Sequence, residues 1–543
     1  MKVAQAIAKA MKAEGVEILF AYPVNPLIEA AAEEDIRTII VRQERTGLHM
    51  ADAYSRLSSG DKIGVFCMQH GPGAENAFGG VAQAYSESVP ILVMPAGYPR
   101  RIAHYYPNFN SVSNMRQVTK WAEPLTMGRA VPEVMRRAFF QLRNGRPGPV
   151  LIEVPVDVFG EDVPEGWTHT PSFRTRSGPD PVAVATAARV LAEAERPVIY
   201  AGQGVHYAKA WDALKALAEA WNIPVTTSIE GKSAFPENHP LSLGSGGRAN
   251  PRPVKRFLAE ADVILGVGCS FALTGFGVPM PAGKTIIHAT LDPMDLAKDV
   301  PVTHGLIGDA ELTLTALTAA MAGLDHAKAK ARSGVAAQIA ELKAAWLAEW
   351  SPKLANDAAP INPYRVIAEL DRLVDKEKTT VTHDAGSPRD QMTPFWEATT
   401  PLSYIGWGKT TQLGYGLGLA MGAKLARPDH LCINVWGDAA IGFTGMDFET
   451  AARERIPILS ILFNNFSMAI EIPIMPVSQA KYGSTDISGN YADMAKAFGC
   501  YGERITDPAD IVAALKRGIA ATQAGQPALL EFITDKEITI SAE

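Results

Sequence analysis

Short apolar runs alternate with helical patterns along the whole chain. Runs with the length and composition of buried strands occur at 37–41, 62–68, 150–154, 197–200, 261–267, 379–383, 431–436 and 456–463. The stretches between them carry apolar residues at helical spacing. Such alternation is typical of parallel sheets covered by helices on both faces. We therefore predict an α/β protein of doubly wound domains with mostly parallel sheets.

Two segments divide this pattern into three blocks. A polar stretch with proline and glycine, 159–181, has the composition of a linker. An Ala- and Lys-rich helical pattern, 327–350, leads into the last block. The length of 543 residues fits three domains of ordinary size. We predict domains at 1–165, 180–325 and 360–543.

Composition and charge narrow the class of protein. The chain is 47% hydrophobic and 20% charged, with a net charge of −7, which argues against a nucleic-acid or anionic membrane surface. Cys67, Cys269, Cys432 and Cys500 are scattered without metal-ligand spacing. No apolar run approaches a membrane span, and the first residues lack a signal pattern. We expect a cytoplasmic enzyme that binds neither nucleic acid nor membrane.

Two of the apolar runs near the C-terminus end in oxygen-bearing side chains. Asp438 follows the run 431–436, and Asn465 follows the run 456–463. The carboxyl ends of neighbouring parallel strands are where α/β sheets place ligands. A carboxylate and an amide oxygen form half of a cage for Mg²⁺, which completes its octahedron with water and diphosphate oxygens. The pattern therefore predicts a diphosphate cofactor held through Mg²⁺.

The first block contains a second candidate site. Glu44 stands where the run 37–41 ends and an Ala-rich helix begins, a position that the helix dipole also favours for any acid. The turn Gly71-Pro72-Gly73 follows the next strand and opens another helix. Its glycines permit close backbone approach to a ligand.

Taken together, these segments resemble the thiamine-diphosphate enzymes of the acetolactate synthase and pyruvate oxidase type. The resemblance covers nearly the whole chain, in the order pyrimidine-binding, central and diphosphate-binding domains. It rests on Arg42–Tyr54, Gly71–Asn76, Arg146–Pro155, Gly414–Leu417, Gly437–Ala439 and Asn464–Asn465. It implies thiamine diphosphate and Mg²⁺ as cofactors.

The resemblance also implies roles for individual residues. Glu44 would hydrogen-bond the pyrimidine ring of the cofactor from across a subunit interface, which implies a homodimer or a homotetramer. Asp438 and Asn465 would bind Mg²⁺ together with the Ser467 backbone carbonyl, and Leu413 would prop the cofactor in a bent shape unless it is ordinary core packing. The other expected cofactor contacts are Gly73, Asn76, Asp384, Gly386, Ser387, the Thr411 backbone, Gly437, Ala439, Ala440 and Met468.

Departures from the family pattern concern the substrate, expected to be a small carbonyl compound. Val24 and Asn25 stand where acetolactate synthases usually carry Gly-Gly, so they would narrow or polarise the reaction face. His70 could shuttle a proton or form a hydrogen bond within its loop. Phe109, Ile470 and Glu471 complete the expected substrate pocket.

The central domain of such enzymes holds flavin, an ADP moiety or nothing. Flavin-bearing relatives often show Arg-Phe-Asp-Asp-Arg where this chain has Cys269-Ser270-Phe271-Ala272-Leu273, so FAD is possible but disfavoured. The turn 201–205 could hold a phosphate or form a plain strand-to-helix turn. The basic residues Arg248, Arg252, Lys255 and Arg256 could bind CoA phosphates or form a solvated helix start.

Three functions remain open from the sequence. The first is cleavage or decarboxylation of a 2-oxo acid or acyloin with C–C bond formation, as in an acetolactate synthase-like carboligase or lyase. The second is a lyase of 2-hydroxyacyl-CoA or oxalyl-CoA type. The third is a non-catalytic paralogue that binds the cofactor, which the presence of Glu44 with Asp438 and Asn465 disfavours.

Overall fold

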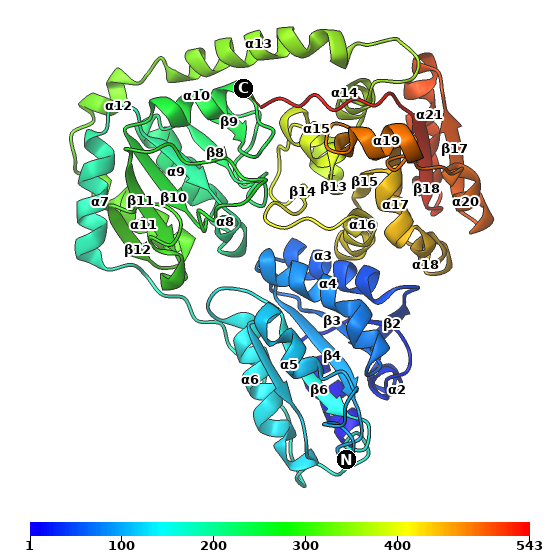
Figure 1. The fold of residues 1–543 in the computed structure, drawn as a ribbon. Coiled ribbons are helices and arrows are strands. Elements are labelled where there is room, and N and C mark those ends of the chain that lie inside the picture. The colour runs from blue at the N-terminus through cyan, green and yellow to red at the C-terminus, as the bar shows by residue number, and fades with distance from the viewer. Residues whose placement is uncertain (543) are drawn as a thin grey trace.

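The computed structural model describes residues 1–542, which form three lobes in chain order (Figure 1). Each lobe contains one six-stranded sheet, and all paired strands run parallel. Helices cover both faces of each sheet. The predicted α/β architecture of three doubly wound parallel sheets is confirmed. Within residues 1–542, no helix combines the length and the apolar character that a membrane crossing requires.

The N-terminal lobe has the strand order β2-β1-β3-β4-β6-β5. Its strands are β1 (Ile18–Ala21), β2 (Arg37–Ile40), β3 (Gly64–Met68), β4 (Ile91–Gly97), β5 (Trp121–Pro124) and β6 (Val150–Pro155). Its α-helices are α1 (Val3–Ala13), α2 (Leu27–Glu33), α3 (Glu44–Leu57), α4 (Pro72–Ser86), α5 (Ser111–Met115) and α6 (Val131–Arg143).

The central lobe has the order β12-β11-β10-β7-β8-β9. Its strands are β7 (Val198–Ala201), β8 (Val225–Thr227), β9 (Ser242–Ser245), β10 (Val263–Val267), β11 (Thr285–Thr290) and β12 (His304–Ile307). Its helices are α7 (Pro181–Glu193), α8 (Gly204–Tyr207), α9 (Trp211–Trp221), α10 (Arg252–Glu260) and α11 (Ala310–Met321). Helices α12 (Ala327–Ala331) and α13 (Val335–Leu354) then cross to the last lobe.

The C-terminal lobe has the order β14-β13-β15-β16-β18-β17. Its strands are β13 (Thr379–His383), β14 (Tyr404–Ile405), β15 (Leu431–Gly437), β16 (Leu459–Asn464), β17 (Tyr501–Ile505) and β18 (Ala528–Ile533). Its helices are α14 (Pro363–Leu373), α15 (Ser387–Phe395), α16 (Tyr415–Ala426), α17 (Asp438–Thr444), α18 (Phe448–Arg453), α19 (Pro476–Tyr482), α20 (Tyr491–Ala497) and α21 (Ile511–Gln523).

The first and third lobes share one topology. Numbered within each lobe, their strands follow the order 2-1-3-4-6-5, whereas the central lobe follows 6-5-4-1-2-3. Each predicted apolar run contains a strand. The run 456–463 enters its strand only at Leu459, after Pro457, which has no N–H for a sheet hydrogen bond. The Ala- and Lys-rich pattern forms two helices rather than one, α12 and α13.

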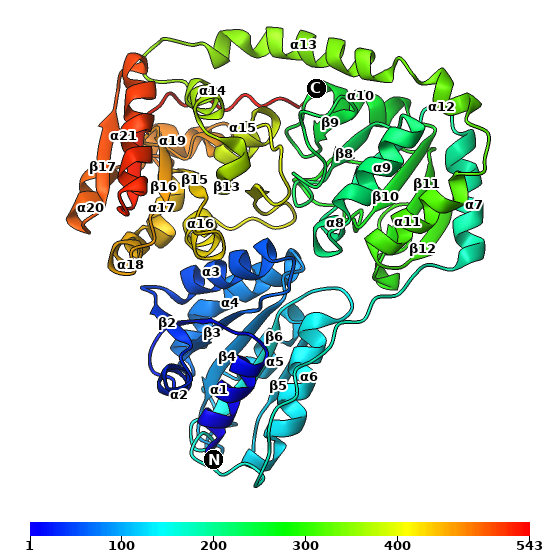
Figure 2. The same cartoon turned by 180° about the vertical axis from the view of Figure 1, so that it is seen from behind.

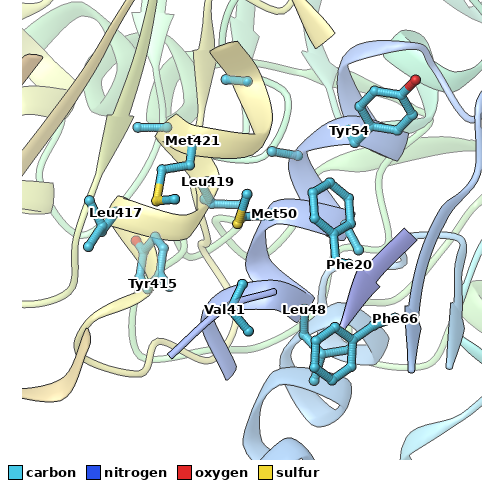
Figure 3. Packing of buried hydrophobic residues seen from close by; sticks show 14 of the residues in the cluster. Phe20, Val41, Leu48, Met50, Tyr54, Phe66, Tyr415, Leu417, Leu419 and Met421 are labelled. Carbon is cyan, nitrogen blue, oxygen red and sulfur yellow. The ribbon is translucent and has the colours of Figure 1, made fainter. Parts of the chain in front are cut away.

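Helices α3 and α16 join the first lobe to the third. Apolar side chains from both helices, among them Leu48, Met50 and Leu419, lie in one buried cluster (Figure 3). A Cβ on Gly422 would lie 2.3 Å from the Met50 carbonyl oxygen, and one on Gly418 would lie 2.6 Å from the His49 Cβ. Because any larger residue at these two positions would overlap α3, glycine allows the backbones of the two helices to lie in direct contact.

The Gly422→Ala substitution is expected to destabilise the protein. The added methyl would overlap the α3 backbone, and such overpacking costs about 1–3 kcal/mol of unfolding free energy. Thermal or urea unfolding measures the loss. Gly323→Ala is the matched control, because a Cβ there meets nothing within 4 Å. Equal stability of the two variants would show that the α3–α16 contact is looser than described.

The C-terminal tail lies on the same side of the molecule as α13 (Figure 2). After β18 it leaves the C-terminal lobe and ends beside the central lobe. The Tyr364 hydroxyl donates to the Thr539 carbonyl at 2.7 Å. The Ser541 hydroxyl donates to the Asn250 carbonyl at 2.7 Å and accepts from Trp346 Nε1 at 2.8 Å. The tail is thereby fixed to two lobes.

Candidate functional site

A cavity with about 610 Å³ of space not filled by protein atoms lies where β13, β15 and β16 end. This is the carboxyl edge of the parallel sheet, where α/β folds bind ligands. The predicted cofactor and substrate residues that line it are Gly386, Ser387, Leu413, Gly437, Asp438, Ala439, Ala440, Asn465, Ser467, Met468, Ile470 and Glu471. The structure thus brings together segments that lie far apart in the sequence.

Two helices begin at this cavity. Helix α15 starts at Ser387 directly after Gly386, whose φ of 83° is readily adopted only by glycine. Helix α17 starts at Asp438. The first N–H groups of a helix have no partner within the helix and favour anions. One wall of the cavity is therefore suited to diphosphate oxygens.

Asp438 and Asn465 place their side-chain oxygens next to each other. Asp438 Oδ2 and Asn465 Oδ1 both accept from the Ser467 N–H, at 3.2 and 2.9 Å. Burial raises the pKa of Asp438, and a bound cation would offset that cost. No cluster of three His, Cys, Asp or Glu side chains that could hold a metal occurs in residues 1–542. A metal here would use two side-chain oxygens plus backbone, water and ligand oxygens, which suits Mg²⁺.

Asp384 does not line the cavity, contrary to the sequence-based expectation. Its side chain is fully buried, and its carboxylate accepts from the N–H groups of Ala385 at 2.8 Å, Gly414 at 2.9 Å and Gly416 at 2.8 Å. Burial raises the pKa of Asp384 to about 7. Because both carboxylate oxygens serve the backbone, Asp384 fixes the loop that carries Leu413.

Thr411 lies near Leu413 on the same loop and is held through its hydroxyl. Arg389 Nη1 donates to Thr411 Oγ1 at 3.1 Å, and the rest of the guanidinium pairs with Asp390. Arg389 also lies over the Phe276 ring of the central lobe, 4.1 Å from its centre. The Thr411 side chain is thus hydrogen-bonded within the protein.

Glu44 and Asn76 lie together on the N-terminal lobe. Glu44 is the first residue of α3 and is buried, and Asn76 of α4 hydrogen-bonds its carboxylate. Burial, with a smaller effect of Asp447, raises the pKa of Glu44, while the Asn76 hydrogen bond lowers it. Neither residue lines the cavity described above. Within one chain the two candidate sites are separate.

Asn25 is not available to a substrate, which corrects the sequence-based expectation. Its Nδ2 donates to the carbonyl oxygens of Met68 at 2.9 Å and Met94 at 3.1 Å. Its Oδ1 accepts from the Leu27 N–H at 3.0 Å. The amide is therefore fully used in tying the β1–α2 loop to β3 and β4.

The other expected residues of the N-terminal lobe lie apart from the cavity as well. Val24 is 73% exposed, and Phe109 packs against the apolar cluster of Figure 3. His70 lies edge-on to Tyr98, with ring centres 4.5 Å apart, and its Nδ1 is buried without a hydrogen-bond partner among the described residues. Gly73 is buried in the first turn of α4. These residues reach a cofactor only if a second chain brings one to them.

The tail supplies cavity residues that sequence patterns did not indicate. Thr534 and Glu537 line the cavity, as do Pro363 and Gln391. Gln391 Nε2 donates to the Glu537 carbonyl at 3.2 Å, while its Oε1 is buried without a hydrogen-bond partner among the described residues. No local motif marks a tail residue, because its role depends on where the tail lies after β18.

The central lobe borders a larger cleft, with about 1510 Å³ of space not filled by protein atoms. Its walls include the turn residues Gln203 and Gly204 and the aromatic side chains Tyr200 and Phe271. Four arginines also line it, and each is paired with carboxylates. The pairs are Arg143 with Glu14, Arg146 with Asp292 and Asp295, Arg174 with Asp61, and Arg176 with Asp309 and Glu311.

The basic cluster of α10 does not border this cleft. Arg252 pairs with Glu349 of α13, and Arg256 pairs with Glu260 of its own helix. Lys255 Nζ donates to the Ala542 carbonyl at 3.3 Å. Arg252 and Lys255 therefore connect α10 to α13 and to the C-terminal tail.

Comparisons with known proteins agree with this arrangement. Three family models match in order: thiamine pyrophosphate enzyme, N-terminal TPP binding domain, at residues 1–120, the central domain at 184–317, and the C-terminal TPP binding domain at 384–532. A probable acetolactate synthase large subunit of Methanocaldococcus jannaschii is 30% identical, covering 98% of this chain and 92% of that protein. A probable acetolactate synthase large subunit of Methanococcus aeolicus is also 30% identical, and the match covers 100% of this chain and 93% of that protein. Acetolactate synthase isozyme 3 large subunit of Escherichia coli is 27% identical over 98% and 94%.

The order of the three lobes and the cavity at the third sheet thus define a thiamine-diphosphate enzyme. The chain belongs to that family, and within it to the acetolactate synthase type.

Proposed function

We propose that this enzyme is a Mg²⁺-dependent carboligase of acetolactate synthase-like activity. It cleaves or decarboxylates a 2-oxo acid or acyloin and transfers the acyl unit to a second carbonyl compound, in the cytoplasm. The names of the relatives support this reaction class. The observation that carries the proposal is the pairing of a diphosphate and metal cavity on one lobe with a buried, hydrogen-bonded Glu44 on another.

The proposed active site forms between two copies of the chain. All residues that line the cavity fall between Pro363 and Glu537, so Glu44 is not supplied within one chain. Exposed apolar side chains occur on the helices that carry both candidate sites: Phe78 and Tyr85 on α4, and Phe443 on α17, with Met446 just after it. Such exposed groups favour association with a second copy. A homodimer is the smallest working unit, and a homotetramer of two dimers has the same sites.

Different residues of the chain would have different roles in such a site. Bound thiamine diphosphate supplies a carbon nucleophile and an electron sink for carbonyl substrates. Asp438, Asn465 and the Ser467 carbonyl would hold Mg²⁺, and the N-termini of α15 and α17 would face the diphosphate. Glu44, with its raised pKa, would hold a proton shared with the aminopyrimidine ring. Ile470 and Glu471 border the cavity where a substrate would enter.

We propose further that FAD and CoA are not required. The four cleft arginines are already paired with carboxylates, and Lys409 is the one further Lys or Arg among the described residues that line the cleft. Arg252, Arg256 and Lys255 are engaged by Glu349, Glu260 and the tail, respectively. A CoA-thioester lyase would need such cationic contacts, and the contacts of the cleft give that alternative no support.

A substrate panel tests the proposal. Purified protein with thiamine diphosphate and Mg²⁺ is incubated with 2-oxo acids, acyloins, diketones and acyl-CoA thioesters, while CO₂ and products are followed. Turnover of a 2-oxo acid or acyloin without CoA or added flavin is the expected result. Turnover of CoA thioesters alone would contradict the proposal. Cofactor binding with no turnover of any substrate would indicate the non-catalytic paralogue.

A further inference from the structure

The loop that carries Thr411 and Leu413 is held by a neighbouring lobe in addition to Asp384 and Arg389 of its own lobe. This 406–413 segment connects β14 to α16 and has no regular secondary structure. Arg56 of α3 donates to the Gly406 carbonyl at 2.8 Å. Gln412 Nε2 donates to the Gly79 carbonyl at 2.9 Å, and the Gln83 amide reaches the Thr410 carbonyl. Helices α3 and α4 of the N-terminal lobe therefore help to fix the backbone of this segment.

Glu87 makes the central contact to the segment. It directly follows α4 and is fully buried. Its Oε1 accepts from two consecutive amides, Gly408 N–H at 3.2 Å and Lys409 N–H at 3.0 Å. Without this oxygen the buried Gly408 N–H and the half-buried Lys409 N–H would both lose their acceptor, and an unpaired buried amide is costly. One carboxyl group thus fixes two successive peptide units.

Gly408 is confined from the opposite side as well. A Cβ at Gly408 would lie 2.9 Å from the carboxyl carbon of Glu230, which belongs to the central lobe. Gly408 therefore lies between carboxyl groups of two different lobes. Few positions remain open to the backbone here, so a displacement of Glu87 would shift the peptide units of Gly408 and Lys409.

A carboxyl group at this position carries a desolvation cost. Burying one is unfavourable unless it is fully paired, and Glu87 Oε2 has no hydrogen-bond partner among the described residues. An apolar side chain would fill the same space at lower cost, but it would leave the two amides free. Glu87 therefore differs from an apolar residue in fixing the backbone of the 406–413 segment through these two hydrogen bonds.

We propose that Glu87 is a positioning residue for the reaction, holding the 406–413 segment so that Thr411 and Leu413 shape the bound cofactor. The proposal rests on the proposed function, because it assumes that Leu413 contacts thiamine diphosphate. Glu87 acts through the segment and lines neither the cavity nor the cleft.

Glutamine is the closest replacement for Glu87. Burial, followed by the nearby Glu230, raises the pKa of Glu87 to about 8, while Lys409 and Arg56 oppose the rise. Tyr207 also faces it. The carboxyl is thus protonated at neutral pH, and the Glu87→Gln amide keeps an oxygen for both N–H groups. Glu87→Ala removes that oxygen.

The raised pKa has a consequence for stability. The native state keeps the Glu87 proton from the ordinary value of 4.5 up to about 8, whereas the unfolded state loses it near 4.5. The unfolding free energy of the wild type should therefore fall, relative to Glu87→Gln, as pH rises across this window. Urea unfolding at several pH values measures the difference. Parallel curves would show that Glu87 is ionised in the native protein.

Hydrogen–deuterium exchange of the unliganded full-length protein tests the proposal first. Peptides that cover 406–413 should exchange at least about tenfold faster in Glu87→Ala than in the wild type, because two amides lose their acceptor. Glu87→Gln should match the wild type, as should Glu133→Ala, a control with an exposed glutamate on α6. Equal exchange in Glu87→Ala and wild type would overturn the proposal. If Glu87→Ala does not fold, faster exchange in Glu87→Asp tests the same contact.

Cofactor titration separates this proposal from the proposed function. With Mg²⁺ present, Glu87→Ala or Glu87→Asp should bind thiamine diphosphate about tenfold or more weakly, with binding restored in Glu87→Gln. Faster exchange without a change in cofactor affinity would overturn the positioning role while leaving the carboligase intact. Failure of the wild type itself to bind thiamine diphosphate would overturn both, and the exchange result would show that the fault lies in the proposed function.

Discussion

Replacing Glu44 with glutamine is expected to lower kcat by on the order of 100- to 10,000-fold, the usual size of a general acid–base contribution. Glu44 is buried at the start of α3, and burial raises its pKa, which favours the protonated form that a general acid needs. Glutamine keeps the shape and the contact with Asn76 but cannot exchange a proton. Binding of thiamine diphosphate should therefore weaken far less than catalysis.

Two measurements on this variant separate catalysis from binding. Exchange of the cofactor C2 proton, followed by NMR after acid quench, should slow together with kcat. Cofactor titration in the presence of Mg²⁺ should stay close to the wild-type value. Glu133→Gln, an exposed glutamate of α6, is the control. Proton exchange at the wild-type rate in Glu44→Gln would exclude Glu44 as the acid–base residue.

Asp438→Ala should instead lose the cofactor. Asp438 Oδ2 and Asn465 Oδ1 both accept from the Ser467 N–H. Among the proposed metal ligands of the chain, Asp438 would supply the only negative charge. Removing a metal ligand should weaken Mg²⁺-dependent binding by on the order of 100-fold or more, since even groups that only orient a ligand account for about 10- to 100-fold. Calorimetric titration of thiamine diphosphate at fixed Mg²⁺ measures this loss.

Two further variants serve as comparisons in that experiment, Asp438→Asn and Asp429→Ala. Asparagine keeps an oxygen without the charge, so its affinity should fall between those of alanine and wild type. Asp429 is exposed in the same lobe and lies before β15, so its replacement should have no effect. Unchanged affinity in Asp438→Ala would exclude this residue as a metal ligand and move the cofactor elsewhere.

Much of the fold followed from local sequence patterns. Parallel strands buried on both faces are near-continuous apolar runs, so all eight predicted runs contain a strand. The cavity segments were also readable, because a strand that ends in Gly-Asp or Asn-Asn places its oxygen at the sheet edge by geometry alone. Asp438 and Asn465 lie side by side for this reason.

The sequence did not reveal which partner each polar side chain finds. Asn25 and Asp384 were expected at the ligand, yet both serve backbone groups of distant strands and loops. Arg389, Gln391 and Glu537 border or support the site through contacts set by the path of the tail and by the neighbouring lobe. Hydrogen bonds between residues far apart in the chain leave no periodic trace.

The most direct test of a carboligase site built from two chains is complementation between inactive variants. Glu44→Gln and Asp438→Ala, carrying different affinity tags, are co-expressed, and the mixed dimers are purified through both tags. In each mixed dimer one site combines Glu44 of one chain with Asp438 of the other. The mixed dimers should recover about half of the wild-type kcat per dimer, while each variant alone stays inactive. Mixed dimers as inactive as their parents would contradict a site shared between two chains.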